Sequence, residues 1–161
     1  MLQLRADITS DCEKLIKLFY QTVHIVNAKD YTKEQLNVWA PDNINSLEWN
    51  ESFLKNYTIV VIDNDEIVGF GDIDKTGYLD RLFVHKDHQR KGIASAICYK
   101  LEQSIKNMKI TTAVSITAKA FFEQRGYRIV KKQEVIRRGV GLINFLMEKY
   151  FSDVIKVSIH F

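Results

Sequence analysis

Hydrophobic and polar residues alternate along some segments of the chain and recur at helical spacing along others. Residues 2–8 alternate and predict a first strand. Apolar residues then recur three and four positions apart from Leu15 to Val26, which predicts a helix. Ser10 and Glu13 have the spacing of a capping box at its start.

Three β-rich segments fill residues 57–84 and are separated by the turn clusters DNDE and DKTG. This pattern is typical of a three-stranded antiparallel meander. Two helical segments are expected before it, at 32–40 and 46–56, and the first ends before the only proline, Pro41.

A polar, basic turn then leads into an expected helix at 91–107. A strand (ITTAVS), a short helix (AKAFFEQR) stopped by Gly126 and two late strands follow. The order β-αα-βββ-α-β-α-ββ predicts a mixed α/β fold with a largely antiparallel sheet flanked by helices. The helix at 91–107 crosses over between two parallel strands. We expect one domain over residues 1–151 and a tail of unknown role at 152–161.

Composition restricts the classes of function. The formal net charge of +3 is too weak to indicate a nucleic-acid partner unless it is clustered. The basic segments HQRKG and EVIRRG lack interleaved aromatic residues, so no nucleic-acid partner is expected. Cys12 and Cys98 form no paired motif, and neither a signal peptide nor a membrane span is evident, so a cytoplasmic protein is expected. His85 and His88 have no cysteine or carboxylate cluster beside them in the sequence, so no metal site is expected.

The segment from Gln89 to Ala94, QRKGIA, lies where a strand passes into a helix. The first N–H groups of a helix have no partner within it, and they attract phosphate together with the helix dipole. Gly92 lets the backbone approach a ligand closely, and Arg90 and Lys91 add positive charge. This segment is therefore interpreted as an anion-binding turn.

The strand RLFV precedes this turn, and SITAKAFFEQRGY follows the helix. With these flanks, the Q-x-x-G-x-A pattern resembles the signature of the GNAT superfamily of N-acetyltransferases, over about residues 1–150. DYTxxQLxxWA resembles one bacterial branch of it. The resemblance implies a sheet splayed between strands 4 and 5, and acetyl-CoA as cofactor. The implied cofactor-binding residues are Leu82, Phe83, Val84, Gln89, Arg90, Lys91, Gly92, Ile93, Ala94, Ser95, Ser115, Phe121, Phe122 and Arg125.

The resemblance also implies an N-acetyltransferase that moves the acetyl group to a primary amine of a small molecule or peptide, by direct attack in a ternary complex. The backbone N–H of Val84 would polarise the thioester carbonyl. Asp80 is the candidate general base, and the alternative is a surface carboxylate paired with Arg81. Phe122 stands where many members carry the tyrosine that protonates the leaving thiolate.

The general acid is consequently left open between water, no acid at all, and a tyrosine elsewhere (Tyr78, Tyr99 or Tyr127). This departure also favours an alternative function, a coenzyme A-binding regulatory or sensor module with little transferase activity. A homodimer is plausible by the same resemblance.

The acceptor pocket of the family corresponds to the region between the first helices. The candidate acceptor-binding residues are His24, Asp30, Tyr31, Trp39 and Asn144. Four of them also have a structural interpretation: Asp30 as a helix cap, His24 as a cation at a helix end, and the two aromatic residues as packing. A buried Asn144 amide would need hydrogen-bond partners, which the acceptor could supply. The identity of the acceptor is not predicted.

Overall fold

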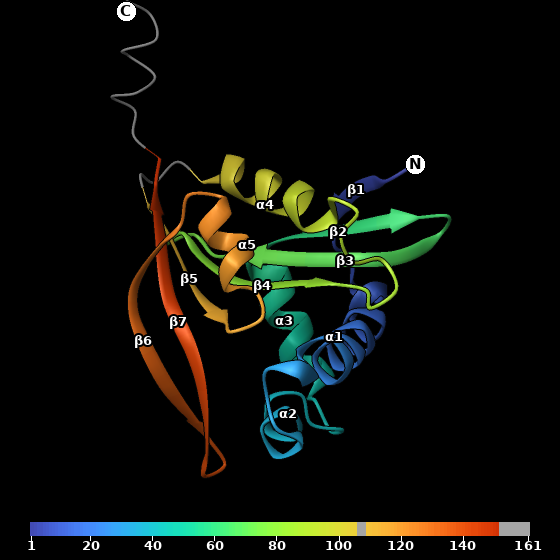
Figure 1. Ribbon diagram of the computed structural model, residues 1–161. Coiled ribbons are helices and arrows are strands. Elements are labelled where there is room, and N and C mark those ends of the chain that lie inside the picture. The colour runs from blue at the N-terminus through green and yellow to red at the C-terminus, as the bar shows by residue number, and fades with distance from the viewer. Residues whose placement is uncertain (106–108, 152–161) are drawn as a thin grey trace, which may run out of the picture.

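The computed structural model describes residues 1–105 and 109–151, so the proposed tail at 152–161 lies outside the described residues. Within them, one sheet of seven strands has the order β1-β2-β3-β4-β5-β7-β6 (Figure 1). The elements are β1 (Gln3–Ala6), η1 (Thr9–Asp11), α1 (Cys12–Val26), η2 (Asn27–Lys29), α2 (Lys33–Trp39), α3 (Ser46–Lys55), β2 (Tyr57–Asp63), β3 (Glu66–Ile73), β4 (Tyr78–Val84), α4 (Ile93–Ser104), β5 (Lys109–Ser115), α5 (Lys119–Gln124), β6 (Arg128–Arg137) and β7 (Val140–Tyr150). The predicted order and fold class are confirmed.

The strands pair antiparallel except for β4 and β5, which are parallel. Only two pairs of residues join those two strands, Tyr78 with Thr111 and Leu79 with Thr112. Beyond Leu79 the strands separate, while β5 remains paired with β7 along its whole length. The splay predicted between strands 4 and 5 is therefore present in the fold.

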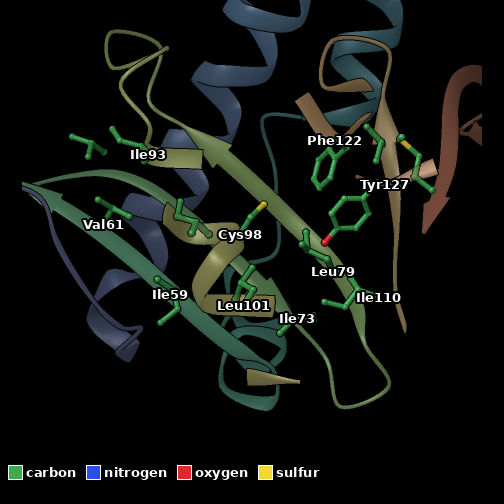
Figure 2. Close-up of a cluster of buried hydrophobic side chains, with 14 residues drawn as sticks. Ile59, Val61, Ile73, Leu79, Ile93, Cys98, Leu101, Ile110, Phe122 and Tyr127 are labelled. Carbon is green, nitrogen blue, oxygen red and sulfur yellow. The ribbon is translucent and has the colours of Figure 1, made fainter. Parts of the chain in front are cut away.

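Helices cover both faces of the sheet (Figure 1). On one face, α4 and α5 pack over a cluster that includes Cys98, Leu101 and Phe122 (Figure 2). On the other face, α1, α2 and α3 enclose a second cluster. Glycines in β3 let α4 approach closely, because a Cβ atom at Gly71 would lie 2.8 Å from Ile97 Cγ2. The position of α4, and of the turn before it, is thus fixed by buried contacts.

The start of α1 differs from the prediction. The capping box expected between Ser10 and Glu13 does not form, because a turn of 3-10 helix precedes α1. Asp11 instead holds the 3-10 turn, since its carboxylate accepts from the backbone N–H of Ile8 (3.0 Å) and pairs with Arg5 (2.7 Å), and its side chain makes no capping bond to α1. The ion pair with β1 thus anchors the 3-10 turn, and α1 begins after this turn, at Cys12.

Candidate active site

A cleft of about 610 Å³ opens between the end of β4, the N-terminus of α4 and the loop from β5 to α5. Most of the predicted cofactor-binding residues line it. These are Leu82, Phe83, Val84, Gln89, Arg90, Gly92, Ile93, Ala94, Ser95, Ser115 and Phe121. The structure thus brings together residues from three separate segments of the chain.

The N-terminus of α4, called the helix mouth below, faces this cleft. Gly92 precedes the helix with φ +79°, and no side chain caps the helix N-terminus. A Cβ atom at this position would meet no atom within 4 Å. Arg90 also has a positive φ, of 61°, and such left-handed residues occur in turns whose successive N–H groups form anion-binding concavities. The turn can therefore hold an anion such as a diphosphate.

The backbone of β4 presents polar groups to the gap beside it. The N–H of His85 donates to the carbonyl of Val68 (2.8 Å), so Val84 and Gly69 form the next, non-hydrogen-bonded pair of the β3–β4 ladder. The N–H of Val84 consequently points away from β3, toward the side where β5 has separated. The same alternation turns the backbone groups of Leu82 to that side, whereas Phe83 is bonded to β3.

The carbonyl of Val84 is already engaged. It accepts from the hydroxyl of Thr22 on α1 (3.1 Å) and from the side-chain amide of Gln89 (2.7 Å). These bonds fix the end of β4 and the first residue of the anion-binding turn against α1. The N–H of Val84 is thereby oriented by its neighbours as a donor toward the gap.

Asp80 lies at this gap. It lines a smaller pocket of about 60 Å³ between β4 and β5, with Trp39 and Phe122 among the other lining residues. The ladder with β3 shifts register here, from the pair Asp72–Arg81 to the pair Ile73–Leu79, so Asp80 is a bulge residue without a partner on β3. The side chain of Asp80 is 40% exposed.

Arg81 is the cationic neighbour of Asp80, at 3.7 Å between Nη2 and Oδ2. Its guanidinium is mainly committed elsewhere, because it donates to Asp72 (2.6 Å) and to Ser52 Oγ (2.7 Å). Burial raises the pKa of Asp72 to about 6, although Arg81 opposes this shift. Asp74, in contrast, accepts backbone N–H groups in the turn between β3 and β4.

Three of the predicted acceptor residues gather where the α1–α2 connection covers the end of β5. The Tyr31 hydroxyl donates to the carbonyl of Ile143 (2.6 Å) and accepts from the N–H of Ile116 (2.9 Å). Asp30 accepts from the hydroxyl of Thr117 (2.7 Å), and the Trp39 ring lies 5.3 Å from the ring of Tyr31. These contacts tie the N-terminal helices to the β5–α5 loop, on the rim of the cleft.

The other two predicted acceptor residues differ from each other. The His24 ring is bonded to the carbonyl of Ala40 (2.8 Å) and packs on Tyr20, so it joins α1 to the end of α2 and does not line the cleft. Asn144 faces Ser115 in the β5–β7 ladder, and its Oδ1 is buried without a hydrogen-bond partner. Asn144 therefore has an acceptor atom available near the end of the gap.

Lys91, Phe122 and Arg125 do not line the cleft, and Phe122 is buried beside the smaller pocket. Lys91 is exposed, and Arg125 pairs with Glu102 of α4. Glu102 also accepts from the Tyr127 hydroxyl (2.7 Å), and the buried Tyr127 ring packs on Phe122 with 5.1 Å between the ring centroids. Burial raises the pKa of Tyr127. The Tyr99 hydroxyl is exposed and accepts from the side-chain amide of Gln103.

Several lining residues were not predicted from the sequence. They are Thr22, Val26, Asn27, Lys29, His88, Thr117, Ala118, Ala120 and Gln124. Most lie on α1, η2 and α5, whose orientation toward the cleft depends on tertiary packing. No local motif marks them, although the proximity of Thr117 to Ser115 in the SITAKAFF segment was a usable signal.

The fold and the open helix mouth beside a splayed parallel strand pair define an acetyltransferase of the GNAT type. The family model for the acetyltransferase (GNAT) domain matches residues 27–149, and the chain belongs to this family. It is 35% identical over 147 residues to the uncharacterised N-acetyltransferase YafP of Escherichia coli, covering 91% of this chain and 94% of that protein.

Solved structures share the fold. A GCN5-related N-acetyltransferase from Rhodopseudomonas palustris superposes with a TM-score of 0.88 at 24% identity, covering 92% of this chain and 94% of that one. The PaiA N-acetyltransferase of Thermoplasma acidophilum, in complex with coenzyme A, has a TM-score of 0.76 at 15% identity, with 93% and 99% covered. Among the described residues, no helix combines the length and hydropathy needed to span a membrane.

Proposed function

We propose that the chain transfers the acetyl group of acetyl-CoA to a primary amine of a small molecule or peptide, by direct attack in a ternary complex. The observation that carries this proposal is the cleft itself, with an uncapped helix mouth at one end and outward N–H groups of β4 at the other. The fold shared with a relative in complex with coenzyme A supports it.

Successive parts of coenzyme A would contact different residues along the cleft. The first-turn N–H groups of α4, from Ile93 to Ser95, would hold the pyrophosphate where Gly92 leaves space. The backbone of Leu82 and Val84 would pair with the pantetheine arm as a strand partner. The bound coenzyme supplies an activated acetyl thioester, and the N–H of Val84 would donate to its carbonyl oxygen.

Asp80 would accept the proton of the attacking amine, directly or through a water molecule. Its place in the gap and its bulged, solvent-accessible position support this role. The buried carboxylate of Asp72 takes up much of the charge of Arg81, which leaves Asp80 less tightly paired than the sequence suggests. A positioned base of this kind contributes typically ~10²–10⁴-fold to the rate.

Water is the general acid that the geometry favours. Phe122 has no proton to give, the Tyr127 hydroxyl donates a hydrogen bond to Glu102, and Tyr99 lies exposed on α4. Tyr78 pairs with Thr111 where β4 and β5 are still joined, and it lines neither the cleft nor the smaller pocket. Trp39, Tyr31 and Asn144 would form the acceptor subsite at the open end of the gap.

We also place the enzyme in the cytoplasm, in line with its two free, buried cysteines. A homodimer stays a prediction.

The test is release of free coenzyme A thiol from acetyl-CoA with a panel of amines. Asp80→Asn should lower the acceptor-dependent rate at least about 100-fold while the Kd for acetyl-CoA stays unchanged. Glu123→Gln, which alters an exposed carboxylate on α5, is the matched control and should retain full activity. An unchanged rate in Asp80→Asn would remove Asp80 as the base. Coenzyme binding without any acceptor-dependent thiol would favour the regulatory or sensor module instead.

A further inference from the structure

The hairpin of β2 and β3 brings a carboxylate to the two histidines that precede the anion-binding turn. Glu66, His85 and His88 each offer one ligand atom, and these atoms lie within 4.8 Å of one another. Glu66 Oε1 is 3.6 Å from Nε2 of His85 and 3.6 Å from Nε2 of His88. No metal site was expected from the sequence, because Glu66 is about twenty positions away and only strand pairing places it here.

We propose that Glu66, His85 and His88 together bind a Zn²⁺ ion. Zinc bonds of about 2.0–2.2 Å in tetrahedral geometry place neighbouring ligand atoms about 3.3–3.5 Å apart. The distances from Glu66 therefore need to change by only a few tenths of an ångström. Two imidazoles and one carboxylate form a complete three-ligand set for zinc, with the remaining position left to water.

The backbone holds these ligands in place. The N–H of His85 extends the β3–β4 ladder by bonding to Val68 (2.8 Å), and the N–H of His88 closes a turn onto the carbonyl of His85 (2.9 Å). The two rings lie 5.1 Å apart and nearly perpendicular, at 86°, which turns both Nε2 atoms toward one carboxylate. Both histidine side chains are about four-fifths buried, whereas that of Glu66 is 58% exposed. A metal can thus enter from the glutamate side.

One contact must open when the metal binds. The N–H of Asp87 donates to Nδ1 of His85 (3.1 Å), which leaves the ring proton of the neutral side chain on Nε2. Coordination through Nε2 moves this proton to Nδ1, so the N–H of Asp87 has to turn away. Nδ1 of His88 is buried without a partner, and it needs no such change. The amide of Asp87 is therefore a local reporter of metal at this site.

The experiment is titration of the metal-free full chain with Zn²⁺, in competition with a chromophoric chelator. We expect one equivalent per chain, and at least a tenfold loss of affinity in Glu66→Gln and in His88→Gln, since loss of an outer-shell partner alone costs about 10–100-fold. Asp65→Asn is the matched control, because it removes the adjacent exposed carboxylate while asparagine tolerates the left-handed backbone there (φ 63°). It should keep the wild-type affinity.

¹⁵N NMR spectra recorded during the same Zn²⁺ titration identify the residues that coordinate the metal. The ring nitrogens of His85 and His88 and the amide of Asp87 should shift with Zn²⁺, while the ring of His24 should not. The titration is repeated in His160→Ala, so that the histidine outside the described residues cannot supply the site. Unchanged affinity in Glu66→Gln, or loss of binding in His160→Ala alone, would overturn the proposal. Both readouts are independent of acetyl transfer, so they stand or fall separately from the proposed function.

Discussion

Replacing Gly92 by glutamate tests the anion-binding turn. Gly92 lines the cleft with φ +79°, and a Cβ atom there would meet no protein atom within 4 Å. We therefore expect a glutamate side chain at this position to reach a bound diphosphate. A left-handed backbone costs a residue with a Cβ about 1–2 kcal/mol. A carboxylate ~5 Å from one phosphate charge adds about 3 kcal/mol of repulsion at an effective dielectric constant of about 20. The Kd for coenzyme A should therefore rise more than about 100-fold.

The control is Gly139→Glu in the β6–β7 hairpin. Gly139 has the same φ of +79° and equally empty surroundings, but it does not line the cleft. Both variants should lose a similar amount of stability, ~2–8 °C in Tm. Only Gly92→Glu should lose coenzyme binding, measured by isothermal titration calorimetry. Wild-type affinity in Gly92→Glu, or an equal loss in both variants, would refute the reasoning.

Three further variants test the fold around the site. Burial raises the pKa of Asp7 to about 6, so the wild type loses stability as the pH rises from about 4 through about 6. Asp7→Asn lacks this loss, and it should be more stable than the wild type by up to about 3 kcal/mol at pH 8 but not at pH 4 in urea unfolding. Tyr31→Phe should cost ~1–3 kcal/mol in the same assay, since two backbone groups lose their shared hydroxyl, whereas exposed Tyr150→Phe should cost almost nothing. Gly71→Ala should cost ~1–3 kcal/mol, because its Cβ would press on α4 and on a β4 carbonyl, and an unchanged Tm would show that α4 is free to move.

The elements were predictable because local signals agreed with the tertiary structure. The two turns of the meander, the proline after α2 and the glycine after α5 all mark boundaries that the structure keeps. The capping box predicted at Ser10 was wrong, because a 3-10 turn whose Asp11 pairs with Arg5 on β1 precedes α1. No local sequence pattern indicates the ion pair between Arg5 and Asp11.

The candidate site was predictable only where one continuous segment supplies it. The predicted residues between Leu82 and Ser95 lie in one continuous segment, and all of them except Lys91 line the cleft. Arg125 belongs to a second motif, but its neighbour Glu102 on α4 holds it away from the cleft. Thr22 and Glu66 act through partners more than fifteen positions away, and such contacts depend on strand order and helix packing.

Amide chemical-shift mapping with coenzyme A tests the central claim most directly. The account predicts that the amides of Gly92 to Ser95, and those of Leu82 and Val84 on β4, shift on binding, while those of the β6–β7 hairpin tip near Gly139 stay in place. Binding that leaves the helix mouth and β4 unperturbed, and shifts amides elsewhere, would contradict it.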